Sequence, residues 1–174
     1  TFRDNQHQLG KGYVLDLQLD LDNLQKNLSE EYVVLMRLHY LVASKFDIKQ
    51  YEGFLYDVSK YDDINDLYII ADMLITDYSS VFFDYANLRR PILFYMYDLE
   101  EYQHNIRNFN IDLNELPGPI VQTEKDLLKE ISTIDTYQER YNESYQKFHD
   151  KYNYLDDGKA AERVAKIVVE GKKL

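Results

Sequence analysis

The stretch from Ala71 to Ala86 constrains the fold more than any other part of this chain. Residues 73–75 form an apolar run with the length of a short buried strand, the polar break at 76–80 contains two serines, and a helix is predicted to begin near Ser79 or Ser80. In open α/β sheets, ligands bind where strands end and helices begin. Free N–H groups at a helix start attract anions, and serine hydroxyls add donors. Simple capping of the helix by a serine is the alternative.

The rest of the chain repeats this alternation between short apolar strands and amphipathic helices. Strands are predicted at 32–38, 54–58, 73–76, 92–95 and 120–121, and helices at 22–28, 62–71, 79–88, 99–106 and 124–131. Asp62 or Asp63 is expected to cap the helix that ends at 71, and Thr123 to cap the helix at 124–131. Residues 15–21 alternate apolar and polar side chains, which fits a strand, but they run directly into a leucine-rich helix. The tail is predicted to be helical in two pieces, divided at 156–158. This order indicates a parallel sheet with helices on both faces.

Composition limits the classes of protein that remain. The 174 residues suffice for one domain with a real core, and no apolar run approaches the ~20 residues of a membrane span. We expect no secretory signal at the N-terminus. Cysteine is absent, which excludes disulfides, thiolate metal sites and a cysteine nucleophile. The formal net charge of −11 argues against nucleic acid and anionic lipid as direct partners of this chain.

Sequence patterns for metals and cofactors are missing as well. His7, His104 and His149 show no metal-ligand spacing, and the chain has neither a P-loop nor a glycine-rich dinucleotide fingerprint. We therefore expect no metal and no cofactor. Because the chain as a whole is acidic, any bound phosphate must be held by local donors.

Polar residues near the predicted strand ends are candidates for chemistry. His39 follows the strand at 32–38, so it could hydrogen-bond or protonate a phosphate, or it could be an ordinary surface histidine. Arg37 lies inside the same apolar run, where it needs a buried ion-pair partner or a path to solvent. Asp84 follows Ser80 by one helical turn, so it could accept hydrogen bonds from ribose hydroxyls or be a solvated helix acid.

The motifs in their order along the chain are similar to those of one family. They are Thr1-Phe2-Arg3-Asp4, Arg37-Leu38-His39, Thr76-Asp77-Tyr78-Ser79-Ser80 with Asp84, Arg90-Pro91, Asp98 to Tyr102, Leu116 to Val121, and Asp157-Gly158-Lys159-Ala160. This order resembles the CDP-glycerol:poly(glycerophosphate) glycerophosphotransferases, which build teichoic acid polymers in Gram-positive bacteria. The resemblance runs almost end to end. It departs from the family at 107–112, where Asn108 replaces a usual glycine, so no ligand contact is transferred to that loop.

The resemblance implies a fold and a reaction. Residues 1–174 would form a single Rossmann-like domain that binds a CDP-alcohol, the C-terminal half of a GT-B fold without its first strand. The complete enzyme would transfer glycerol phosphate from CDP-glycerol to the terminal hydroxyl of a lipid-linked poly(glycerol phosphate) chain and release CMP. It would act as a peripheral protein at the cytoplasmic face of the membrane. The base that activates the acceptor would lie on the missing N-terminal domain, so this fragment alone would bind CDP with little or no transfer.

The resemblance also implies residue roles. His39 would be catalytic, stabilising or protonating the phosphate of the departing CMP. Ser79 and Ser80 would hold the diphosphate, and Asp84 would hold the ribose. The other expected substrate-binding residues are Arg3, Arg37, Thr76 and Asp77. From the residues alone, Arg3 could equally be a surface residue, and Asp77 could merely satisfy nearby N–H groups.

Two other interpretations compete with this one. Within enzymes, the donor could be CDP-ribitol, or the chain could belong to a UDP-sugar glycosyltransferase of the same GT-B architecture. In another class, the chain could be a non-catalytic flavodoxin-like receiver or interaction module. Asp77 could imitate the phosphorylated aspartate of a receiver, but no acidic pair follows the first predicted strand.

Overall fold

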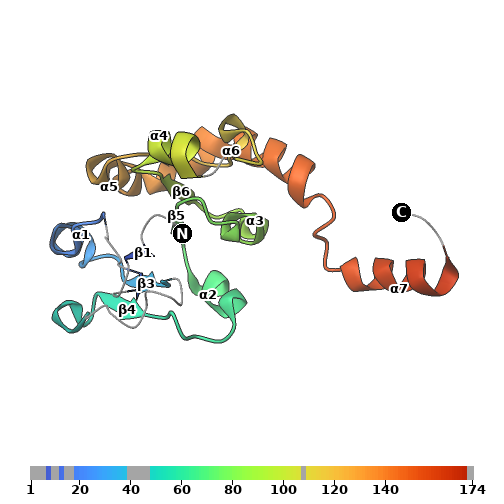
Figure 1. The fold of residues 1–174 in the computed structure, drawn as a ribbon, viewed down its shortest axis with the longest axis horizontal. Helices are drawn as coiled ribbons and strands as arrows, with labels where there is room; N and C mark the ends of the chain where they lie inside the picture. Colours follow the sequence, from blue (N-terminus) through green and yellow to red (C-terminus); the bar gives the residue numbers. More distant parts are fainter. Residues whose placement is uncertain (1–6, 9–11, 14–17, 39–47, 107–108, 172–174) are drawn as a thin grey trace.

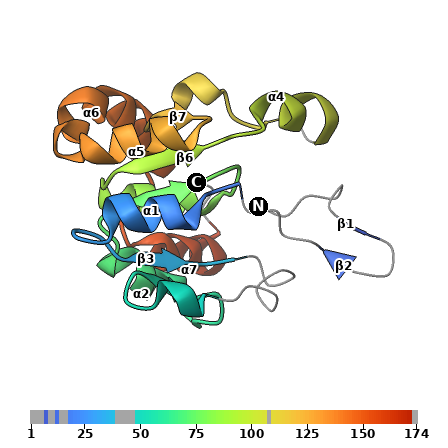
Figure 2. The same cartoon turned by 90° about the vertical axis from the view of Figure 1, so that its left-hand side faces the viewer.

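The fold alternates strands and helices along most of the chain (Figures 1 and 2). The computed structural model describes residues 7–8, 12–13, 18–38, 48–106 and 109–171. Its first half contains β1 (His7–Gln8), β2 (Gly12–Tyr13), α1 (Leu21–Leu28), β3 (Val34–Met36), η3 (Lys49–Tyr51), β4 (Leu55–Asp57), α2 (Ile64–Ile70), β5 (Leu74–Thr76), α3 (Val81–Tyr85) and η4 (Ala86–Leu88). Its second half contains β6 (Ile92–Tyr95), α4 (Leu99–Glu101), η5 (Tyr102–Ile106), η6 (Leu113–Glu115), β7 (Ile120–Val121), α5 (Glu124–Ser132), η7 (Ile134–Thr136), α6 (Tyr137–Phe148), η8 (His149–Asn153) and α7 (Ala160–Glu170).

The described strands form two parallel sheets, not the single sheet that the sequence predicts. One sheet has the order β5-β6-β7, and the other pairs β3 with β4, while β1 and β2 form a separate antiparallel pair. Within the described residues, β3 and β5 each pair on one side only, so no backbone ladder joins the two sheets. In Figure 1 the β3–β4 pair lies below β5 and β6.

The main core is built around β6. All four of its side chains are buried. Helix α5 packs across β6 and β7, and Phe82 of α3 packs on Phe94 of β6, with ring centroids 5.1 Å apart. Both faces of β6 are therefore covered, as in sheets with helices on both sides. A second, smaller core joins α1 to η3 and β4. Its buried members are Leu21, Leu24, Tyr51, Phe54 and Leu55.

Several helix boundaries follow from capping residues that the sequence displays. The Asp63 carboxylate accepts from the Asn65 N–H at the start of α2, at 2.9 Å, and the Thr123 hydroxyl accepts from the Asp126 N–H at the start of α5, at 3.1 Å. Both caps were expected from the pattern of a short polar residue before an amphipathic run. The predicted helix at 99–106 is present as one turn of α-helix followed by the π-helical η5.

Two predicted elements are shorter than expected. The apolar run at 32–38 contributes only β3 (Val34–Met36) to a ladder, because its flanking residues have no strand opposite them in β4. The predicted helix at 79–88 divides into α3 and the 3₁₀ turn η4, which ends at Arg89 in the left-handed region with φ of 53°. Both changes affect the candidate site, because they move Arg37 out of a strand and Ser79 and Ser80 out of a helix.

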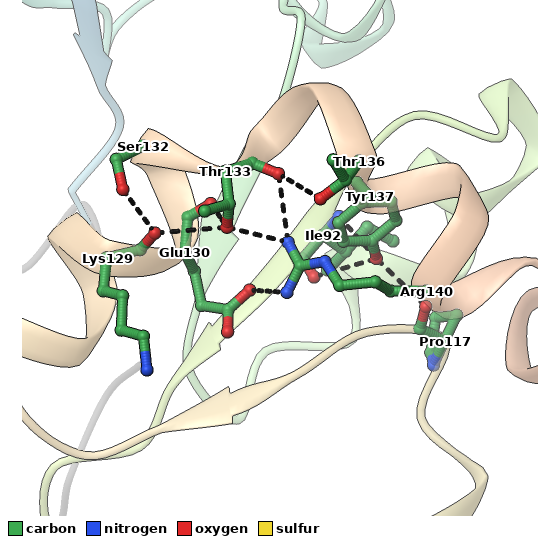
Figure 3. A network of polar contacts seen from close by, with 9 residues as sticks. All are labelled: Ile92, Pro117, Lys129, Glu130, Ser132, Thr133, Thr136, Tyr137 and Arg140. Carbon is green, nitrogen blue, oxygen red and sulfur yellow. Dashed lines mark hydrogen bonds and ion pairs between the residues drawn. The ribbon is translucent and has the colours of Figure 1, made fainter.

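A buried tyrosine fixes the connection between β6 and the stiff Pro117-Gly118-Pro119 turn (Figure 3). The hydroxyl of Tyr137 accepts from the Ile92 N–H at 3.1 Å and lies within hydrogen-bond distance of the carbonyls of Ile92, at 3.1 Å, and Pro117, at 3.0 Å. A Cβ atom at Gly118 would collide with the Ile92 carbonyl oxygen and the Tyr137 hydroxyl, so only glycine fits there. The turn is therefore fitted to the start of β6 by backbone contact.

The last helix is attached differently from the others. In Figure 1, α7 stands apart from the two sheets at the end of an extended connection. None of its side chains is buried, and Val168 and Val169 are 76% and 83% exposed. Its first turn is held by the Arg163–Asp157 ion pair at 2.6 Å. The core of the described fold therefore ends with η8.

The Tyr137 hydroxyl provides a first test of this core. Tyr137→Phe keeps the ring but removes the only donor that the Ile92 and Pro117 carbonyls share, and leaves a buried N–H without its acceptor. We expect the free energy of unfolding to fall by about 1–3 kcal/mol in a urea titration. Tyr154→Phe, at a tyrosine that is 63% exposed, serves as the control and should change it by less than about 0.5 kcal/mol. Equal effects of the two changes would contradict the role given to Tyr137.

Buried tyrosines should also make stability depend on alkaline pH. Burial raises the pKa of Tyr85 to about 12 and raises the pKa of Tyr137 and Tyr145 above the ordinary tyrosine value. Above about pH 10 the unfolded chain loses these phenolic protons while the folded chain keeps them, so stability is complete below about pH 10 and falls as the pH rises. Each such phenol contributes a slope of about 1.4 kcal/mol per pH unit.

This dependence is measured by urea midpoints together with tyrosinate absorbance between about pH 9 and pH 11. The midpoint should decrease across that range, and Tyr145→Phe should make the decrease shallower because it removes one of these three phenols. A midpoint that stays constant across the range would show that these phenols ionise as easily in the folded chain as in the unfolded one.

Candidate functional site

The turn between β5 and α3 lies at the carboxyl edge of the three-stranded sheet. Strand β5 runs parallel to β6 with Thr76 opposite Phe94, so both strands end at the same edge. The chain then passes through Asp77, Tyr78 and Ser79 and enters α3 after Ser80. Thr76, Asp77 and Ser79 are half-buried, and Ser80 is exposed. The turn therefore lies at the carboxyl edge of a parallel sheet, as predicted, which is the edge where ligands bind in open α/β sheets.

The two serines do not act as ordinary helix caps. Ser80 occupies the N-cap position of α3 with φ of −69° and ψ of −3°, and its side chain makes no capping hydrogen bond. Its carbonyl accepts from the Phe83 N–H at 3.1 Å. In the part of the chain that the structure describes, neither the Ser79 nor the Ser80 hydroxyl has a hydrogen-bond partner. The capping alternative is therefore wrong for Ser80, and both hydroxyls are available to a ligand.

The helix that follows the turn is short, which changes how the turn would bind an anion. Helix α3 has five residues, so its dipole is much smaller than that of the ten-residue helix predicted from the sequence. Any anion at this turn would be held mainly by hydroxyls and by turn amides, and little by the helix as a whole. Asp84 lies one turn beyond Ser80 on the same side of α3 and is exposed.

Arg37 lies in a different place from that predicted. It is exposed and follows β3, because the strand ends at Met36, so of the two predicted alternatives the buried ion pair is wrong and the path to solvent is confirmed. Its Nη1 atom donates to the carbonyl oxygens of Val58, at 3.2 Å, and Tyr61, at 2.8 Å. These bonds, together with the Leu38 N–H donating to Ser59 Oγ at 2.9 Å, hold the end of β3 against the loop after β4. His39 and Arg3 lie outside the described residues.

A buried tyrosine that the sequence did not single out lies on α2. Tyr68 is 8% exposed, and its buried hydroxyl has no hydrogen-bond partner among the described residues. Burial is the main cause that raises the pKa of Tyr68; the negative charge of Asp84 raises it further, and the positive charge of Arg37 opposes this.

The structure brings five of the predicted residues together. Thr76, Asp77, Ser79 and Ser80 share one turn, and Asp84 lies one helical turn beyond it. Arg37 lies after β3, bonded to the loop that follows β4. Tyr68 had no signal in the sequence beyond its place on the apolar side of a helix, so the burial of its hydroxyl required the tertiary structure. Among the described residues, no group of three or more histidine, aspartate or glutamate side chains could hold a metal ion.

A parallel α/β fold with polar side chains gathered at its strand ends defines a ligand-binding α/β domain. Comparison with known proteins identifies the family. Residues 1–170 match the family model described as CDP-Glycerol:Poly(glycerophosphate) glycerophosphotransferase, and the chain belongs to this family. The resemblance of the motifs is therefore confirmed over nearly the whole sequence.

Named relatives and a solved structure agree with this assignment. The chain is 44% identical over 173 residues to the teichoic acid poly(glycerol phosphate) polymerase of Bacillus subtilis (strain 168), covering 99% of this chain and 23% of that protein. It is 38% identical over 172 residues to the teichoic acid poly(ribitol-phosphate) polymerase of Bacillus spizizenii (strain ATCC 23059 / NRRL B-14472 / W23), covering 97% and 26%. The structure of the wall teichoic acid polymerase TagF superposes with a TM-score of 0.86 at 40% identity, covering 98% of this chain and 42% of that chain.

These comparisons fix the fold and its extent. The architecture is that of part of TagF, a GT-B enzyme, as the resemblance implied. The chain spans about a quarter of the length of the curated relatives named above. The non-catalytic receiver interpretation has no support from these relatives, whose names are those of polymerases.

The unbonded Ser80 hydroxyl leads to a prediction about stability. Ser80→Ala should change the free energy of unfolding by less than about 0.5 kcal/mol, because it removes no hydrogen bond among the described residues. Thr123→Ala, which removes a helix cap that is present, should cost about 1 kcal/mol. Urea titrations of the two variants measure both quantities. A loss at Ser80 as large as that at Thr123 would show that Ser80 caps α3 after all.

Proposed function

We propose that this chain forms the donor-binding domain of an enzyme that polymerises glycerol phosphate. The enzyme transfers glycerol phosphate from CDP-glycerol to the terminal hydroxyl of a lipid-linked poly(glycerol phosphate) chain and releases CMP. The observation that carries this proposal is the 44% identity, over 99% of this chain, to a poly(glycerol phosphate) polymerase. Residues 1–174 act in it as one CDP-alcohol-binding domain.

The chemistry requires positioning more than covalent help. The oxygen of the acceptor hydroxyl attacks the β-phosphorus of CDP-glycerol, and the bond from that phosphorus to the oxygen bridging to the α-phosphate breaks. The hydroxyl proton passes to a base, and CMP leaves with the bridging oxygen. Such a transition state is stabilised by alignment of the groups and by neutralisation of charge on the phosphate oxygens. Donors that reach these oxygens are therefore the residues that matter most.

The residues of this chain divide these tasks. The hydroxyls of Ser79 and Ser80 donate to the diphosphate, and this assignment is supported by their lack of partners among the described residues. The exposed Asp84 carboxylate accepts hydrogen bonds from the ribose hydroxyls. Arg37 supplies positive charge from the end of β3, since only its Nη1 atom is engaged with the two backbone carbonyls.

Further roles rest on the family relationship. His39 stabilises or protonates the phosphate of the departing CMP, and Arg3 contributes positive charge to phosphate binding. Thr76 and Asp77 shape the turn that carries the two serines. These local donors offset the formal net charge of −11, which would otherwise repel a nucleotide diphosphate.

The remaining steps of the reaction are assigned to parts of the enzyme other than residues 1–174. The base that activates the acceptor and the contact with the lipid-linked chain are assigned to the other domain of the GT-B enzyme, and the enzyme works at the cytoplasmic face of the membrane as a peripheral protein. The chain alone therefore binds the donor nucleotide and does not transfer. No helix among the described residues combines the length and apolar character that crossing a bilayer requires.

A CDP-ribitol donor is the second candidate. It is favoured by the 38% identity to a poly(ribitol-phosphate) polymerase, which covers nearly the same residues as the match to the glycerol enzyme. The cytidine diphosphate portion is common to both donors. The two proposals therefore share the site at Ser79, Ser80 and Asp84 and differ only in the alcohol.

Calorimetric titration of the chain with CDP, CDP-glycerol, CDP-ribitol and UDP tests the proposal. We expect saturable binding of CDP and of one CDP-alcohol more tightly than UDP. Asp84→Asn should weaken CDP binding by about tenfold or more, the equivalent of one hydrogen bond to a charged group.

The control for this variant is Asp135→Asn, which removes an exposed aspartate in η7 and should leave CDP affinity unchanged within about twofold. Absence of CDP binding by the wild-type chain would contradict the donor-site proposal. Tighter binding of UDP would favour a sugar-nucleotide donor, and preference for CDP-ribitol over CDP-glycerol would favour the second candidate.

A further inference from the structure

Tyr78 lies in the middle of the turn that carries the two serines, and both its ring and its hydroxyl make contacts outside the turn. Its ring stacks on that of Tyr102, with centroids 3.6 Å apart and an interplanar angle of 14°. Its hydroxyl donates to Asp98 Oδ1 at 2.9 Å. The ring of Phe109 lies 5.6 Å from that of Tyr78 and 5.5 Å from that of Tyr102, which closes a cluster of three aromatic rings.

Both anchors belong to the same segment, which follows β6. Asp98 occupies the N-cap position of α4, but its side chain makes no capping bond. Its backbone carbonyl accepts from the Tyr102 N–H at 2.9 Å, so the acceptor and the stacking partner of Tyr78 are rigidly linked. Tyr102 is buried at the start of η5. The turn after β5 is thus tied to the segment after the neighbouring strand.

The regular elements on either side of the turn do not by themselves fix its conformation. Helix α3 has five residues and begins without a side-chain cap. The β5–β6 ladder ends at the pair Thr76 and Phe94, before the turn begins. A ligand that must order a loose turn loses affinity, whereas one that meets a fixed turn does not. An anchor at Tyr78, next to Ser79, would hold both serine hydroxyls in place before the ligand arrives.

We propose that Tyr78 is a positioning residue for the diphosphate. It acts through its stack with Tyr102 and its hydrogen bond to Asp98, which together fix the backbone that carries Ser79 and Ser80. It touches no substrate atom itself. This inference rests on the proposed function, because it presupposes that the two serines hold a diphosphate. A bond from a phenol to a carboxylate is stronger than one between neutral groups, so loss of this single bond should be measurable.

The test separates the diphosphate from the rest of the nucleotide. The wild-type chain, Tyr78→Phe and Tyr61→Phe are titrated with CDP and with cytidine, which lacks the phosphates. Tyr61→Phe is the matched control, because it also removes a tyrosine hydroxyl that donates to an aspartate, here Asp66 Oδ2 at 3.1 Å, at an exposed position outside the turn.

We expect Tyr78→Phe to weaken CDP binding by about tenfold, the lower end of the range for a hydrogen bond to a charged group, and to leave cytidine binding unchanged within about twofold. Tyr61→Phe should change neither. Asp98→Asn should weaken CDP binding less than Tyr78→Phe does, and the double variant should bind CDP no more weakly than Tyr78→Phe alone, since the bond is already absent.

Two results would overturn the inference while leaving the proposed function intact. One is CDP binding by Tyr78→Phe equal to that of the wild-type chain. The other is an equal loss of CDP and cytidine binding, which would indicate a structural role in the whole domain. A wild-type chain that binds neither ligand would overturn the proposed function together with this inference. If the wild-type chain bound cytidine as tightly as CDP, the turn would not be the binding site of the diphosphate, and the inference would be overturned.

Discussion

The burial of β6 on both faces is the constraint on which the rest of the structure depends. Its four apolar side chains are covered, and β5 and β7 pair with it on either side. The Tyr137 hydroxyl and the Pro117-Gly118-Pro119 turn fix where this strand begins. The ladder with β6 then sets where β5 ends, and so where the turn with Ser79 and Ser80 lies. The candidate site is positioned by a strand that contributes no side chain to it.

The site combines a firm framework with polar groups left unengaged. Thr76 ends a paired strand, and the turn beyond it is anchored through Tyr78. On the other sheet, Arg37 is held by two carbonyls after β4. The Ser79 and Ser80 hydroxyls belong to this anchored turn, and the exposed Asp84 carboxylate lies one helical turn beyond it. Fixed scaffolds that carry unsatisfied polar groups are typical of binding sites, because the ligand and not the protein completes the hydrogen bonds.

Local patterns in the sequence predicted what depends on local interactions. The strand at 92–95 has the predicted bounds, and Asp63 and Thr123 cap the helices that they were expected to cap. Such features need only an apolar run or one polar side chain in the right place. The motif at 76–80 also gave the correct position of the turn. The family resemblance then supplied the fold and the class of enzyme, which the later comparisons confirmed.

Features that depend on partners distant in sequence were not predictable. Arg37 was placed in a strand because the apolar run continues past Met36, whereas the ladder with β4 ends there. Tyr78 carries no signal of its own, since its role comes from Asp98 and Tyr102 on another segment. The division into two sheets likewise reflects which strand edges meet. Pairing across the fold, and not residue type, decides these cases.

The uncapped start of α3 links folding of that helix to occupancy of the site. Thr123 shows that this chain caps a helix with a hydroxyl where no ligand is expected, whereas Ser80 leaves its hydroxyl unengaged. An anion that hydrogen-bonds to Ser79 and Ser80 would supply the missing interactions from outside the chain. The first turn of α3 would then be marginal in the empty protein and would become more stable as the nucleotide concentration rises above its dissociation constant.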